Sequence, residues 1–188
     1  PFLTSSEDSV FAALLALSEK SDEEVIRETE DCYRLLKEQF STGNALQSLS
    51  HALALGEGTA KEKCERTIRL YDLLKEKGCK YGTSYELATL GVLALLPAKL
   101  ETIAEDVAET DAFLAKQKGY GFFGFSRKQR LMHAGLIVAS DYIGENVELK
   151  MGAAAVGGTI ALIVAQQTAI CAAVVAVSAA ASNSSSSS

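Results

Sequence analysis

The sequence has few of the residues that usually build a catalytic or metal site. Its 188 residues include only two histidines and no tryptophan. The four cysteines are far apart and form no C-x-x-C pair, whereas a structural zinc site needs four closely patterned Cys or His ligands. We therefore expect no metal and no other cofactor. Scattered cysteines of this kind are typical of reduced thiols in a cytoplasmic protein. They are Cys32, Cys64, Cys79 and Cys171.

Proline is also scarce, and this indicates the fold class. The chain has two prolines, is 48% apolar and is rich in Ala, Leu, Glu and Lys, a composition that favours an all-α protein. Its length suits one domain with a sizeable core. The net charge of −6 argues against a dedicated nucleic-acid binder. The first residue is Pro1 and not Met, so we expect the sequence to be N-terminally truncated.

Two kinds of segment alternate with a period near 40 residues. One kind is short and apolar after a polar start, in 6–18, 43–56, 82–96 and 126–140. The other is amphipathic, in 32–40, 70–78 and 110–119. This pattern predicts an α-solenoid-like, HEAT-like array of about four helical hairpins. We expect one domain over 1–181, with repeats at 4–42, 43–81, 82–124 and 125–181, and a flexible Ser-rich tail at 182–188.

Helix boundaries follow from capping residues and glycines. Four capping boxes are predicted, each an acceptor followed three residues later by Glu or Gln: Thr4/Glu7, Ser21/Glu24, Thr59/Glu62 and Ser126/Gln129. We also expect Asn44 to cap a helix and Pro97 to lie in a first turn. The predicted helices are 5–18, 22–40, 44–55, 59–77, 84–96, 97–118 and 126–142.

Long stretches of the chain resemble one known family. They are LSHALALGEG, KCERTIRLYDLLKEKGCKYGTSYELATLGVLALL and FLAKQKGYGFFGFSRKQRLMHAGLIVA, together with the Ala-rich, Ser-ended C-terminus. These resemble a bacterial family known only as domain of unknown function 4003. The resemblance implies a bacterial, helical protein without an assigned activity, and it transfers no catalytic residue.

The run GYGFFG, residues 119–124, has the G-x-G-x-x-G spacing of dinucleotide-binding proteins and kinases. A dinucleotide site needs a strand before the glycines and an acidic residue about 20 positions later, and a kinase loop needs flanking strands. The preceding residues, AFLAKQK, end a predicted helix instead. We interpret the glycines as helix punctuation, although they do not explain the neighbouring phenylalanines.

Charge makes this region unusual. No Asp or Glu occurs from Ala112 to Ser140. Arg127, Lys128 and Arg130 occupy the first turn of a predicted helix, where the helix dipole favours acidic residues. Such a helix start can bind an anion, although charge runs are more often solvated faces. Both interpretations stay open.

Equivalent loops of a repeat array stack along one edge. We therefore predict a ligand-binding or partner-binding edge where each amphipathic helix leads into the next apolar one. The alternative is a small-molecule or enzyme pocket around Tyr81, Tyr120, Arg127 and Arg130, although no nucleophile–base–acid spacing indicates catalysis. The candidate residues are Tyr81, Thr83, Ser84, Tyr120, Phe122, Ser126, Arg127, Lys128, Arg130 and His133.

Residues 151–181 carry no charge and are long enough to cross a bilayer. However, they are rich in alanine, and Gln166 and Gln167 fall near the middle, where lipid disfavours polar groups. We favour buried helices that complete the fourth repeat, with a membrane anchor as the alternative. The expected function is that of a non-catalytic cytoplasmic interaction module with a protein or anionic small-molecule partner.

Overall fold

The computed structural model describes residues 20–82, 86–120 and 124–145, which form six helices and no strand. The all-helical prediction is therefore confirmed for these residues. The predicted helix 5–18, the apolar segment 151–181 and the tail 182–188 lie outside them. The helices are α2 (Asp22–Leu36), α3 (Asn44–Leu55), α4 (Ala60–Glu76), α5 (Glu86–Leu95), α6 (Leu100–Leu114) and α7 (Arg127–Glu145).

The predicted capping boxes at Ser21 and Thr59 are both present. Each side chain accepts a hydrogen bond from the third helical residue, whose Glu side chain bonds back to the cap. Hydrogen bonds from Ser21 lower the pKa of Glu24 below its ordinary value. The helix α2 therefore begins at Asp22 as predicted, and α4 begins at Ala60, one residue after the predicted start.

The cap predicted at Asn44 and the first-turn position predicted for Pro97 are wrong. Gly43 occupies the cap position of α3, and Asn44 is the first helical residue. Pro97 lies in a turn before α6, which begins at Leu100 after the cap residue Lys99. That turn has its own backbone bond, from the Ala98 N–H to the Leu96 carbonyl, so the chain reorients before the helix starts.

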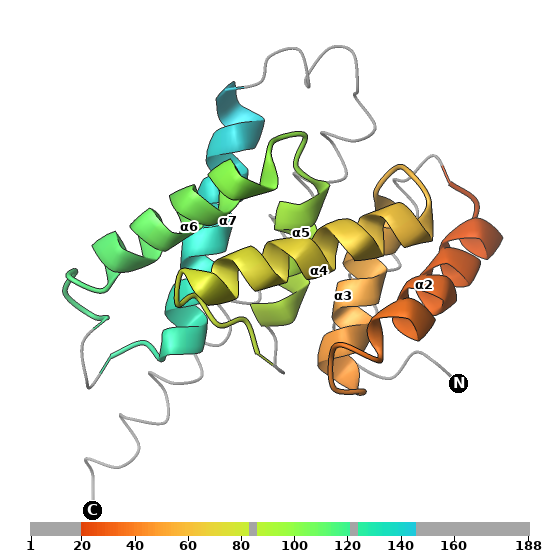
Figure 1. Ribbon diagram of the computed structural model, residues 1–188, viewed down its shortest axis with the longest axis horizontal. Helices are drawn as coiled ribbons and strands as arrows, with labels where there is room; N and C mark the ends of the chain where they lie inside the picture. The colour runs from red at the N-terminus through yellow and green to blue at the C-terminus, as the bar shows by residue number, and fades with distance from the viewer. Residues whose placement is uncertain (1–19, 83–85, 121–123, 146–188) are drawn as a thin grey trace, which may run out of the picture.

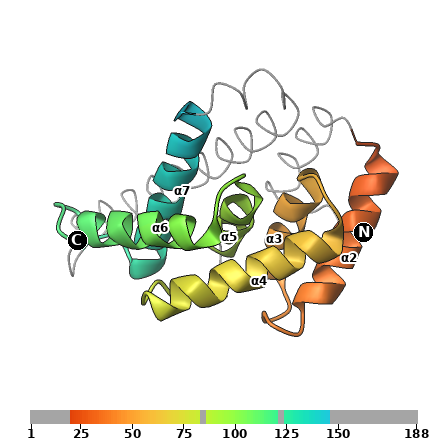
Figure 2. The same cartoon turned by 45° about the horizontal axis from the view of Figure 1, so that its top comes forward.

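The helices form two layers (Figure 1). The apolar helices α3, α5 and α7 pack in sequence, α3 on α5 and α5 on α7. The amphipathic helices α2, α4 and α6 also pack in sequence, and each contacts the apolar helix that follows it in the chain. In the turned view of Figure 2, α6 crosses α7.

Burial follows this arrangement. Residues 86–94 of α5 are all buried, because α3, α7 and α4 surround the helix. In α2 only Val25, Cys32 and Leu36 are buried, on one stripe. An all-apolar surface is stable only between other elements, whereas an amphipathic helix can face water.

Glycines allow the apolar helices to approach closely. A Cβ on Gly91 of α5 would lie 2.8 Å from Leu49 Cδ1 of α3. A Cβ on Gly135 of α7 would lie 2.6 Å from Thr89 Cγ2 of α5 and 2.8 Å from the Tyr81 hydroxyl. Thr89 and Tyr81 are both buried, so neither has room to move away.

We predict that Gly135→Ala destabilises the protein by about 1–2 kcal/mol, because overpacking a tight contact costs more than the helix gains from alanine. Urea denaturation measures the change. Ser140→Ala is the matched control, since Ser140 is exposed on the same helix and should change stability by less than about 0.5 kcal/mol. Equal stability of Gly135→Ala and the unmodified protein would contradict the close packing of α5 on α7.

Candidate functional site

The predicted binding edge includes the start of α7. Ser126 caps this helix as expected: its hydroxyl accepts from the Gln129 N–H at 3.3 Å, and the Gln129 side chain accepts from the Ser126 N–H at 2.8 Å. Ser126, Arg127 and Lys128 are exposed. The cap and the first two residues of α7 therefore present polar side chains to solvent.

The three cations of this turn contact three other parts of the fold. Arg127 Nη2 donates to the Gly78 carbonyl oxygen at 2.6 Å, just beyond the end of α4. Lys128 Nζ lies 3.8 Å from Glu86 Oε1 of α5. Each contact provides an acceptor or a negative charge for a residue that the helix dipole disfavours at this position.

Arg130 makes the third and most extensive contact, with Asp111 of α6. Its Nε and Nη2 donate to the two carboxylate oxygens at 2.8 and 3.1 Å. Both side chains are largely buried, with 17% and 11% of their surfaces exposed. The hydrogen bonds to Asp111 raise the pKa of Arg130. This bidentate pair joins α6 to α7.

Tyr81 lies in the core, and not on the exposed edge where the loop alignment places it. Only 2% of its surface is exposed, and its hydroxyl donates to the Leu131 carbonyl at 3.2 Å. Burial raises the pKa of this hydroxyl. The phenol thus joins the start of α5 to α7 and does not face a ligand in solution.

Tyr120 and His133 lie together beside Phe125. The Tyr120 hydroxyl and His133 Nδ1 are 2.6 Å apart, and the Phe125 ring meets the His133 ring edge to face, with centroids 5.2 Å apart. Both Tyr120 and His133 are partly buried. Burial lowers the pKa of His133 below its ordinary value of 6.5.

The G-x-G-x-x-G run closes a loop on itself. The Phe125 N–H donates to the Gly119 carbonyl at 2.8 Å, and a Cβ on Gly124 would lie only 1.7 Å from that oxygen. The run follows the helix α6 and not a strand. The two ends of the run therefore lie close together, which accounts for Gly119 and Gly124. Of the other predicted site residues, Thr83, Ser84 and Phe122 lie outside the described residues.

Glu86 is a buried residue of this region that the sequence analysis missed. It has no exposed surface, and its Oε1 accepts from the Gly82 N–H at 3.1 Å. Its other carboxylate oxygen, Oε2, has no hydrogen-bond partner, and neither has the buried hydroxyl of Thr89 one turn later. No sequence signal separates Glu86 from the many exposed glutamates of the chain.

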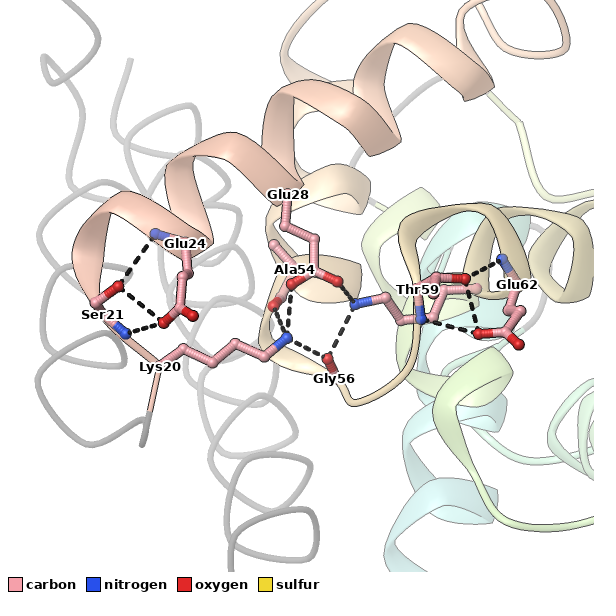
Figure 3. A network of polar contacts seen from close by, with 9 residues as sticks. Lys20, Ser21, Glu24, Glu28, Ala54, Gly56, Thr59 and Glu62 are labelled. Atoms are coloured by element: carbon pink, nitrogen blue, oxygen red, sulfur yellow. Dashed lines mark hydrogen bonds and ion pairs between the residues drawn. The ribbon is translucent and has the colours of Figure 1, made fainter.

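A second polar cluster, also missed, lies at the opposite end of the helices. Lys20 Nζ binds Glu28 of α2 at 2.6 Å and the carbonyl oxygens of Ala54 and Gly56 at 2.9 and 2.6 Å (Figure 3). The buried Lys63 of α4 binds the other Glu28 oxygen and the same Gly56 carbonyl. Burial lowers the pKa of Lys63, and its hydrogen bond with Glu28 opposes that effect.

Arg66 binds the end of the next apolar helix in the same way. Its Nε donates to the Ala94 carbonyl at 2.6 Å, and its Nη2 donates to the Leu96 and Ala98 carbonyls at 2.8 and 2.5 Å. An open hollow of 660 Å³ lies over this contact, between the start of α4 and the turn before α6.

Neither cluster has the composition of a metal site. Within residues 20–82, 86–120 and 124–145, no group of three or more His, Cys, Asp or Glu side chains could hold a metal ion. In the same residues, no helix is both long and apolar enough to cross a bilayer. Lys20, Lys63 and Arg66 bind carbonyl and carboxylate oxygens of the protein itself.

The lowered pKa of His133 predicts how stability depends on pH. Because the pKa of His133 is lower in the folded protein, the folded state binds fewer protons than the unfolded state. The contribution of His133 to the free energy of unfolding is therefore complete above the ordinary pKa of histidine and is lost as the pH falls through the folded pKa. We expect His133→Gln to lose less stability than the unmodified protein between about pH 7.5 and about pH 5.5. Urea denaturation at the two pH values measures this, and equal losses in both proteins would refute the assignment.

Comparison with known proteins identifies the family but no activity. No curated protein and no solved structure matches the chain. One family model matches residues 1–169, which is most of the sequence, and its description is "Protein of unknown function (DUF4003)". The chain therefore belongs to the DUF4003 family, as its sequence signature predicts.

Proposed function

We propose that this chain is a non-catalytic helical-repeat interaction module that binds an acidic segment of a protein partner. The proposed surface is the basic edge, which consists of Lys80, Lys116, Lys118, Arg127 and Lys128. All five side chains are exposed. The single observation behind the proposal is that these cations come from three helix ends that meet, in a chain whose net charge is −6.

The contacts described above bring these helix ends together. Arg127 reaches the carbonyl that follows α4, and the bond between Phe125 and Gly119 connects the region after α6 to the start of α7. The N-terminus of α7 adds the positive end of its dipole. An edge of one charge sign attracts and orients a partner of opposite sign.

We further propose that the fold is an array of about four HEAT-like hairpins with a period near 40 residues. Glu28, Arg66 and Asp106 are 38 and 40 residues apart. Glu28 holds the lysines at the end of α3, Arg66 binds the end of α5, and Asp106 accepts the Tyr142 hydroxyl of α7 at 2.8 Å. This position contacts the following apolar helix directly in α4 and α6, and through Lys20 and Lys63 in α2.

A pocket at Tyr81, Tyr120, Arg127 and Arg130 has weaker support. Tyr81 is buried with its hydroxyl engaged. Arg130 uses its Nε and Nη2 on Asp111, so an incoming anion would have to compete with a carboxylate that is already in place. Attachment to a membrane through 151–181 concerns residues outside those described and stays a prediction of the sequence.

Charge reversal at the edge tests the proposal. A photo-crosslinking residue at position 126 identifies the partner, and titration calorimetry then measures its affinity for purified protein. We expect Lys116→Glu with Lys118→Glu to weaken binding about tenfold or more at low salt, because like charges repel an acidic partner. The difference should shrink at high salt, which screens exposed charges.

Lys61→Glu is the matched control. Lys61 is 77% exposed in the first turn of α4, at the other end of that helix from the basic edge. This variant should bind as the unmodified protein does. Equal affinity of the double variant and the control would contradict the proposal. A thermal shift with inorganic phosphate that disappears in Arg127→Gln would instead support the small-anion alternative.

A further inference from the structure

The thiols of Cys32 and Cys64 lie together in the core, where α2 packs against α4. Cys32 has no exposed surface and Cys64 is 2% exposed. The Cys64 sulfur is 3.8 Å from the carbonyl oxygen of Cys32, to which its thiol donates. The two thiols are also close enough to shift each other's pKa. Cysteines 32 positions apart in the sequence thus lie side by side where α2 packs against α4.

A buried cation lies beside the pair. Lys63 precedes Cys64 in the chain, is 4% exposed, and is held by Glu28 and by the Gly56 carbonyl. A positive charge near a thiol favours the thiolate, which is the nucleophilic form.

The surroundings make the two thiols unequal. The hydrogen bond with Cys64 is the main cause that lowers the pKa of Cys32, and the charge of Lys63 adds to it. The same hydrogen bond raises the pKa of Cys64, which keeps its proton. Cys32 therefore ionises more readily than Cys64, and a more acidic thiol beside a second thiol that can resolve an oxidised sulfur is the usual arrangement of a redox-active dithiol.

We propose that Cys32 and Cys64 form a dithiol that hydrogen peroxide converts to a disulfide joining α2 to α4. The Cys32 sulfur attacks one peroxide oxygen and breaks the O–O bond, which gives a sulfenic acid and a hydroxide that takes up the thiol proton as water. The Cys64 sulfur then attacks the Cys32 sulfur, and the S–O bond breaks to release a second water. Overall, two thiols give two electrons to one peroxide and yield one disulfide and two waters.

Burial restricts which oxidants can react. Both thiols are buried, so an oxidant reaches them through local opening, which admits small molecules more readily than bulky disulfides. Cys79 provides an internal comparison. It is also buried, but burial raises its pKa, so its thiolate is scarcer at neutral pH. We therefore expect Cys32 to react before Cys79.

The test uses the full chain with hydrogen peroxide, followed by thiol blocking, intact-mass measurement and peptide mapping. We expect the loss of two hydrogens, a peptide pair joined through Cys32 and Cys64, and reversal by dithiothreitol. The oxidised protein should also unfold at a higher temperature, because the bond constrains the unfolded chain. Oxygen addition without this cross-link, or a cross-link through other cysteines only, would overturn the proposal.

Two variants separate the roles of the residues. Lys63→Met should slow disulfide formation several-fold, whereas Lys61→Met, which changes an exposed lysine two residues earlier, should keep the original rate. If Lys63→Met does not fold, Cys64→Ala tests the proposal instead. It should accumulate a Cys32 sulfenic acid that dimedone traps, and trapping at Cys79 in preference to Cys32 would contradict the assignment.

Discussion

The backbone carbonyl groups at the ends of the apolar helices are the constraint on which this structure depends. The last carbonyls of a helix have no partner within it, and they carry the negative end of its dipole. Neither α3 nor α5 has a basic residue in its last turn. The donors come instead from elsewhere in the fold: Lys20 and Lys63 bind beyond α3, and Arg66 binds beyond α5. Lys63 thereby joins α4 to the end of the preceding apolar helix, and Arg66 joins α4 to the apolar helix that follows it.

The same principle explains the cationic first turn of α7. Arg127 binds a carbonyl at the end of α4, and Arg130 binds a carboxylate of α6. These charges lie at the positive end of the α7 dipole, which is unfavourable. Contacts with neighbouring helices offset this cost. Their exposed companions on the basic edge, Lys116 and Lys118, stand at the end of α6, where the dipole favours cations. Arg127 and Lys128 therefore belong both to the contacts between helices and to the proposed partner-binding surface.

Local patterns predict the helices well, but they do not predict contacts between helices. The limits of α3 match the prediction to the residue, because glycines flank a short apolar run. The start of α6 is displaced by three residues, since its preceding turn is held by Arg66 of another helix. The sequence groups the candidate site residues only because they lie in equivalent loops. Their partners, Asp111 for Arg130 and Glu86 for Lys128, depend on how the two layers of helices pack. The meeting of Cys32 and Cys64 likewise follows from the α2–α4 contact, which no spacing in the sequence encodes.

The role of cations at helix ends is tested most directly by two arginines on one helix. Arg66 and Arg69 are both in α4, but Arg66 binds three carbonyls at the end of α5, whereas Arg69 makes an exposed ion pair with Glu101. The measurement is the free energy of unfolding of Arg66→Met and Arg69→Met by urea denaturation. We predict a loss of at least about 2 kcal/mol for Arg66→Met, because three charged hydrogen bonds to carbonyl oxygens at and just beyond the end of α5 are lost. Arg69→Met should lose less than about 1 kcal/mol. Equal and small losses in the two variants would contradict the account.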